Sequence, residues 1–123
     1  MTTKKDDTIT IFGIKNCNTM KKAFVYLDEH HISYQFHDYK KQGIDKKHLQ
    51  AWCKEHGWEK VINKAGLTFK KLTDEQKKDL TESKAIDLMI ALPSMIKRPV
   101  LDVGNKTLLG FKAEEYDQVL SLK

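Results

Sequence analysis

Cys17 is the residue of this chain whose surroundings most favour covalent chemistry. It follows an alternating β-branched and aromatic run, Thr8 to Phe12, and a short turn, and it stands directly before a segment with helical spacing of apolar residues. The free N–H groups and positive dipole end of a helix stabilise a thiolate, and Lys15, Lys21 and Lys22 add positive charge nearby. The sequence therefore predicts a nucleophilic thiolate that can attack a disulfide sulfur, a peroxide or an arsenic oxyanion.

The two cysteines do not form a dithiol motif. None of the three residues after Cys17 is a cysteine, so a mixed disulfide on Cys17 would need another thiol to resolve it. Cys53 lies beside Trp52 on the apolar side of a predicted helix, which favours core packing over a resolving role. For Cys17 itself, a small buried hydrophobe at the end of a strand is the alternative interpretation.

Neither a metal site nor a general base is expected. The two cysteines and five histidines lack the spacing of zinc ligands. His30 and His31 close a predicted helix, where cations interact favourably with the dipole, and the other histidines lie at predicted exposed positions. A thiolate at a helix N-terminus needs no base, so none is assigned.

A strand, a helix and a second strand are expected to position Cys17. After the strand over 8–12, apolar residues at helical spacing predict a helix over 18–31, with Asn18 or Thr19 as its cap. Alternation predicts a strand over 32–39. Such a βαβ unit is right-handed and its strands are parallel, which leaves Cys17 at the turn between strand and helix.

The middle of the chain is predicted to be helical and its end to form a hairpin. We expect a helix over 45–56 that Asp45 caps and Gly57 ends, then a short turn over 58–62 and a connecting segment over 63–72. A capping box from Thr73 to Gln76 opens the next helix, and a helix over 83–92 ends before Pro93. Strands over 99–103 and 107–109 flank the turn at Gly104-Asn105, and a helix over 113–120 follows. The order predicts an α/β protein with a thioredoxin-like mixed four-stranded sheet, helices on both faces and an all-helical insertion. Residues 1–7 are expected to be a disordered tail, and 8–123 a single domain.

Composition limits the classes of function. A charged fraction of 32% and the lack of a long apolar run or signal peptide predict a cytoplasmic protein with no membrane partner. The net charge is +5, but the lysines are spread among acidic residues along the chain, which argues against direct nucleic-acid binding. Arg98 is the one arginine of the sequence.

Four segments in this order resemble the ArsC family, and most closely its YffB-like branch. They are GIKNCNTMKKA (13–23), NKAGLTFKKL (63–72), PSMIKRPVL (93–101) and LLGF (108–111), and the resemblance covers residues 8–120. The family includes glutaredoxin-coupled arsenate reductases, YffB-like proteins regarded as glutathione-dependent thiol reductases, and Spx-like regulators that bind RNA polymerase. The resemblance implies the thioredoxin-like fold and a catalytic role for Cys17.

The resemblance also implies residues around the thiol. Pro99 matches the cis-proline that faces the catalytic turn, and Arg98 matches an arginine that binds the oxyanion. Lys64 stands beside Ala65, where relatives commonly have arginine, and Lys112 stands where another arginine is expected. We therefore expect Arg98, Lys15, Lys21 and Lys64 to bind an anionic substrate. Asn16, Thr19 and Pro99 are expected to support the active site structurally.

The expected function is that of a thiol-dependent reductase. Arsenate reductase-like activity is a further expectation, and the absence of two arginines that the resemblance leads us to expect weakens the case for it. No tightly bound cofactor is expected, and glutathione is the predicted co-substrate because its negative charge suits a basic site. A glutaredoxin-like reductant is the alternative thiol donor, and the substrate is expected to be a small anion. Two other functions stay open: an Spx-like regulator that binds RNA polymerase, and a protein of this fold that has lost activity. The chain is expected to be a monomer.

Overall fold

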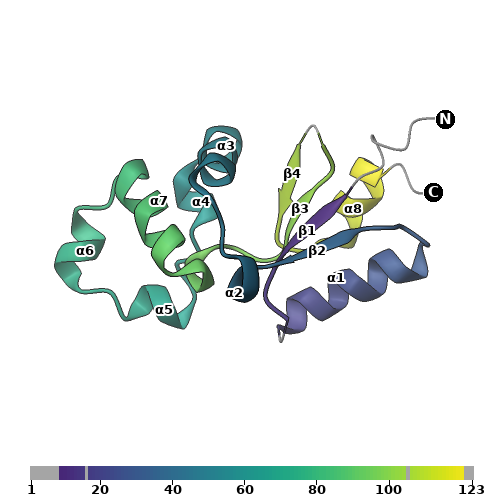
Figure 1. Cartoon of the computed structure of the whole chain (residues 1–123), viewed down its shortest axis with the longest axis horizontal. Coiled ribbons are helices and arrows are strands. Elements are labelled where there is room, and N and C mark those ends of the chain that lie inside the picture. Colours follow the sequence, from purple (N-terminus) through teal and green to yellow (C-terminus); the bar gives the residue numbers. More distant parts are fainter. Residues whose placement is uncertain (1–8, 16, 105, 121–123) are drawn as a thin grey trace. The chain divides into compact units, whose positions relative to one another are not determined.

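The computed structural model describes residues 9–15, 17–104 and 106–120, which divide into two units (Figure 1). The first unit comprises the chain up to Asp38 and from Arg98 onward, and the second comprises Tyr39–Lys97. The predicted tail over 1–7, Asn16 and Asn105 of the predicted turn lie outside the described residues.

The first unit is built on a mixed four-stranded sheet in the order β2-β1-β3-β4. Its strands are β1 (Thr10–Gly13), β2 (Gln35–Asp38), β3 (Val100–Asp102) and β4 (Thr107–Leu109). β1 pairs with β2 in parallel, while β1 with β3 and β3 with β4 are antiparallel. The predicted sheet, its parallel βαβ unit and its C-terminal hairpin are confirmed, and the order is that of a thioredoxin-like fold.

Two helices share one core with this sheet. They are α1 (Asn18–Glu29) and α8 (Ala113–Leu120), and α8 has the bounds that its apolar spacing predicted. Ile11, Leu27, Leu101 and Tyr116 are fully buried members of this core, and Cys17 packs against it from its edge. Both helices thus pack on the sheet face to which Ile11 and Leu101 contribute. This packing places the start of α1 beside the end of β1.

The second unit is helical, as predicted for the middle of the chain (Figure 1). Its elements are α2 (Tyr39–Gln42), α3 (Lys46–His56), α4 (Trp58–Val61), α5 (Leu67–Lys70), α6 (Asp74–Lys78), α7 (Glu82–Ala91) and a 3₁₀ turn (Pro93–Met95). The predicted caps are confirmed: the Asp45 carboxylate accepts the His48 N–H at 2.9 Å, and Thr73 with Gln76 forms a reciprocal capping box. Leu49, Val61, Met89 and Ile96 are buried in this unit.

Several predicted boundaries are corrected: β1 ends at Gly13 and not at Phe12, and β3 spans Val100–Asp102 and not 99–103. The strand expected over 32–39 is limited to Gln35–Asp38, because Tyr39 turns into α2 and buries its ring. The connecting segment over 63–72 contains α5, and α7 begins one residue early because the Thr81 side chain caps it. α1 ends at Glu29, since His31 has a left-handed φ of 57° that leads toward β2.

No helix among the described residues is both long and apolar enough to cross a membrane.

Candidate active site at the Cys17 thiol

Cys17 is the N-cap residue of α1, which corrects the expectation that Asn18 or Thr19 caps this helix. Its backbone is extended, with φ −133° and ψ 131°, and its carbonyl accepts the N–H of Lys21 at 3.0 Å. Cys17 is half-buried. The end of β1 and the first turn of α1 approach each other closely on either side of Cys17. Glycine at position 13 permits this approach, since an added Cβ there would lie 2.3 Å from Sδ of Met20.

The first turn of α1 and Arg98 together favour the thiolate of Cys17. The Cys17 side chain makes no capping hydrogen bond of ordinary geometry. Burial opposes ionisation and is the largest single influence, yet donation from the Met20 N–H, the Arg98 guanidinium and the Thr19 N–H outweighs it, so the pKa of Cys17 lies below its ordinary value. The site therefore holds a thiolate more readily than an isolated cysteine does.

Arg98 reaches the thiol because of strand pairing. β3 runs antiparallel to β1 with Val100 opposite Phe12, so the residues before β3 lie at the same end of the sheet as the turn after β1. The Arg98–Pro99 peptide bond is cis, as predicted. The guanidinium hydrogen-bonds the Cys17 sulfur and adds a favourable charge interaction with the thiolate.

The other predicted site residues are distributed over both units. The Thr19 N–H is one of the groups that lower the pKa of Cys17, in line with the predicted effect of the free N–H groups at the helix start. Lys15 and Lys21 are exposed. Lys64 belongs to the second unit, where its Nζ lies 3.8 Å from Oε2 of Glu59 and 5.6 Å from the centroid of the Trp58 ring. The structure thus brings Cys17, Thr19 and Arg98 together within the first unit.

Sequence reasoning missed Met20 as a functional residue. Its side chain is fully buried, which is what its apolar spacing indicated. Its backbone N–H is the donor that lowers the pKa of Cys17 most. The signal was available, since Met20 is the third helical residue after an N-cap and N-cap side chains accept from that position.

Cys53 has the opposite environment. It lies buried on α3, and burial together with the Glu82 carboxylate raises its pKa to about 11. Cys53 is therefore a neutral thiol near pH 7, as expected for a cysteine that packs in a core.

A cavity of about 370 Å³ lies along α1. We call it the α1 cavity and define it by its lining residues: Lys21, Lys22, Val25, Tyr26, Glu29 and Phe111. Val25 is 53% exposed, and it is the one large hydrophobic side chain in the described part of the first unit with so open a position. The α1 cavity therefore combines an apolar surface with two ammonium groups and the carboxylate of Glu29.

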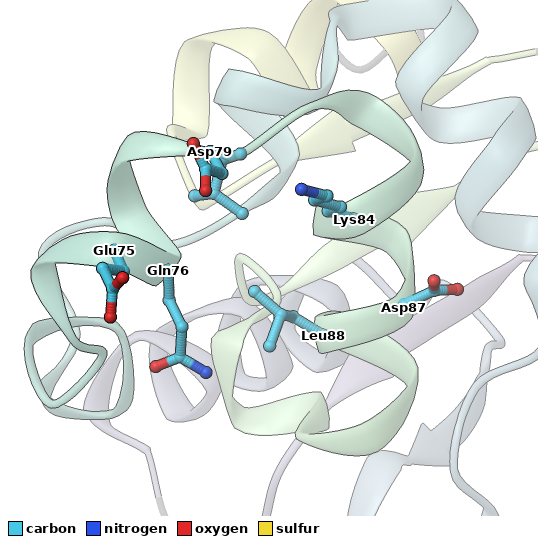
Figure 2. A pocket seen from close by; sticks show the side chains of 7 residues that line it. Glu75, Gln76, Asp79, Lys84, Asp87 and Leu88 are labelled. Atoms are coloured by element: carbon cyan, nitrogen blue, oxygen red, sulfur yellow. The ribbon is translucent and has the colours of Figure 1, made fainter.

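A second cavity, of about 470 Å³, lies between α6 and α7 in the helical unit (Figure 2). Figure 2 shows the carboxylates of Glu75, Asp79 and Asp87 and the Lys84 ammonium around it, with Leu88 beside them. It contains no cysteine or histidine, and no group of three metal-ligating side chains occurs within the described residues. This cavity contains no thiol, so Cys17 stays the candidate for thiol chemistry.

Comparison with known proteins gives the family context of this site. The family model described as "ArsC family" matches residues 12–119. A solved structure named YffB is 59% identical, covers 91% of this chain and 98% of its own, and superposes with a TM-score of 0.89. An arsenate reductase (ArsC) related protein from Brucella melitensis is 46% identical over 94% of this chain and 96% of its own, with a TM-score of 0.73. The global transcriptional regulator Spx of Streptococcus pyogenes serotype M3 is 28% identical over 92% of this chain and 85% of its own length.

Proposed function

This chain belongs to the ArsC family, and we propose that it is a thiol-dependent reductase in which Cys17 is the nucleophile and glutathione the reductant. The observation that supports the proposal is the half-buried position of Cys17 at the N-cap of α1, where the Met20 N–H, the Arg98 guanidinium and the Thr19 N–H lower the pKa of the thiol although burial raises it. A structural cysteine has no need of three donors to its sulfur, whereas a nucleophile that works near pH 7 does.

The reaction proceeds through two exchanges of sulfur. The Cys17 thiolate attacks the glutathione sulfur of a mixed disulfide, RS–SG; a Cys17–SG bond forms, the S–S bond of the substrate breaks and RS⁻ leaves. A glutathione thiolate then attacks the Cys17–SG disulfide and releases glutathione disulfide, which restores the Cys17 thiolate. The net reaction is RS–SG + GSH → RSH + GSSG: one glutathione sulfur enters with the substrate disulfide, the attacking glutathione thiol is oxidised, RS⁻ takes up the proton that this thiol gives up, and no second protein cysteine is required.

Arg98 supports both exchanges in this proposal. Its guanidinium lies at the sulfur that is negatively charged before attack and after resolution, where a fixed cation stabilises the charge. A guanidinium can also bind a carboxylate in a bidentate manner, and glutathione carries two carboxylates. Lys15 and Lys21 are exposed and would attract the anion, an effect that added salt weakens.

Arsenate is a further substrate in the proposal, because an arsenic oxyanion is also open to attack by a thiolate and a related structure is named as arsenate reductase-related. Within the first unit, Arg98, Lys15 and Lys21 are the predicted oxyanion ligands. Since lysine is a point charge that cannot replace the planar fork of arginine, turnover of arsenate is expected to be slower than turnover of a mixed disulfide.

The test is the coupled reduction of hydroxyethyl disulfide by glutathione, with glutathione reductase and NADPH recording the glutathione disulfide formed. Cys17→Ser is expected to abolish the protein-dependent rate. Cys53→Ala is the matched control, since it removes the other thiol and is expected to retain the rate. Equal rates for the Cys17→Ser variant and the unaltered protein would refute the proposal.

A second candidate function is regulation through RNA polymerase, which the similarity to Spx favours. In that case the surface of the protein matters and the thiol does not. Retention of polymerase subunits from a lysate by the Cys17→Ser variant, with no reductase activity in the unaltered protein, would support this candidate over the reductase.

A further inference from the structure

Lys21 lies one helical turn from Cys17 and lines the α1 cavity. Its N–H donates to the backbone carbonyl of Cys17 at 3.0 Å, which places the two residues on successive turns of α1. Residues four apart are neighbours along a helix and are separated by about 6 Å of rise. Cys17, Lys21 and Val25 therefore form one row along α1, about 12 Å long, that begins at the nucleophile and ends at an exposed apolar side chain.

The chemistry changes in a defined order along this row. The thiolate comes first, the ammonium groups of Lys21 and Lys22 follow, Val25 and Phe111 form the apolar part, and the Glu29 carboxylate lies one turn beyond Val25 at the far end. Such an order is complementary to a ligand that carries a sulfur, then a carboxylate, then an apolar group. The net charge of +5 further favours an acidic ligand.

An extended polypeptide matches the spacing of the row. Its residues rise about 3.3 Å each and alternate residues point to the same side, so side chains two apart are about 6.6 Å from one another. A cysteine, an acidic residue two positions away and an apolar residue four positions away would thus face Cys17, Lys21 and Val25 in turn.

We propose that the α1 cavity binds an extended segment of a glutathionylated protein substrate, a proposal that rests on the proposed function. The bound segment has an acidic residue two positions from the glutathionylated cysteine and an apolar residue four positions from it. Glutathione alone does not explain the cavity, because it has no apolar side chain to cover Val25 and Phe111. Binding places the substrate disulfide at Cys17; the Cys17 thiolate takes the glutathionyl sulfur, the substrate cysteine leaves as a thiolate, and free glutathione resolves Cys17–SG as above.

Two glutathionylated nine-residue peptides test the proposal. The first has the pattern Leu-x-Glu-x-Cys-x-Glu-x-Leu, which presents the residues in both chain directions, and in the second Lys replaces Glu and Ser replaces Leu. Peptides of this length do not hold a helix in water. The first peptide gains one ion pair between its Glu and Lys21 and buries one Leu side chain against Val25. We therefore expect its kcat/KM to be about tenfold higher than that of the second peptide.

Val25→Asp is the variant that tests the cavity, and Leu67→Asp is its matched control. Leu67 is 75% exposed and belongs to the second unit. We expect Val25→Asp to bring the two peptides to within about twofold of each other, and Leu67→Asp to keep the tenfold preference. Cys17 alkylation by iodoacetamide at the unaltered rate verifies that Val25→Asp is folded.

The outcomes separate this proposal from the proposed function. If hydroxyethyl disulfide is reduced but both peptides react equally in the unaltered protein, the docking proposal is overturned and the reductase stands. If neither the peptides nor hydroxyethyl disulfide are reduced through Cys17, both fail. A dimer in sedimentation that Val25→Asp dissociates would assign the cavity to a second copy of the chain and would also overturn the docking proposal.

Discussion

Removal of one hydroxyl from the aromatic cluster beneath the α1 cavity is expected to stabilise the protein. Tyr116 is fully buried, and its hydroxyl makes no hydrogen bond to the part of the chain that the structure describes. Its ring packs edge-on against Tyr26 at 5.5 Å and Phe111 at 4.8 Å between centroids, contacts that phenylalanine retains. The change Tyr116→Phe thus removes a buried polar group and keeps the packing.

Tyr26 is the control, because it lies in the same cluster and its hydroxyl donates to the Asp117 carboxylate. A buried hydroxyl without a partner costs about 1–3 kcal/mol, and the small void left by its removal offsets part of the gain, so Tyr116→Phe should raise the free energy of unfolding by about 1 kcal/mol. Tyr26→Phe loses a hydrogen bond to a charged group, but Asp117 is exposed and regains water, so the expected loss is about 1 kcal/mol.

Urea unfolding followed by far-ultraviolet circular dichroism measures the difference. With a slope near 2 kcal/mol per molar urea, the midpoints of the two variants should differ by about 1 M, Tyr116→Phe being the more stable. The reasoning is wrong if Tyr116→Phe unfolds at a lower urea concentration than the unaltered protein, or if the two variants coincide at equal slopes.

Three further predictions follow from the site and the caps. In the Cys53→Ala background, Cys17 should react with iodoacetamide at a lower pH than an ordinary thiol does, because its pKa is lowered. Arg98→Met should shift the pH profile of this reaction upward, and Arg98→Lys should shift it less. An unchanged profile in Arg98→Met would contradict the role of the guanidinium. Asp45→Ala removes the cap of α3 and should lower the free energy of unfolding by about 1 kcal/mol, measured by urea unfolding, with Asp45→Asn retaining most of it. Both tryptophans lie in the second unit, so tryptophan fluorescence and circular dichroism should give coincident unfolding curves if residues 8–123 form one cooperative domain.

Local signals in the sequence were sufficient for most of the elements. Asp45, Thr73 and Gln76 cap the helices that they were predicted to cap, because a cap depends on side chains and N–H groups within three residues. Four-residue helices such as α2 and α5 were missed, since one helical turn is too short to show a periodic pattern.

The candidate site could be predicted only in part for a related reason. The position of Cys17 at a helix N-terminus is a local property, and the sequence revealed it. The meeting of Arg98 with Cys17 depends on the register of β1 and β3, and the contact of Phe111 with the α1 cavity depends on tertiary packing. The resemblance to the ArsC family supplied the role of Arg98, and nothing in the sequence indicated the cavity.

The two cysteines show which feature of the fold distinguishes a reactive thiol from a structural one. Burial raises the pKa of both, and for Cys53 it prevails because the Glu82 carboxylate adds to it. Cys53 is inside α3, where backbone N–H groups are engaged by carbonyls of the preceding turn, so none is left for its sulfur. Cys17 stands at the cap, where the N–H groups of Thr19 and Met20 have no carbonyl partner within α1 and can donate to the sulfur. The same side chain therefore favours the neutral thiol within a helix and the thiolate at its start, and Arg98 adds to a difference that the helix position creates.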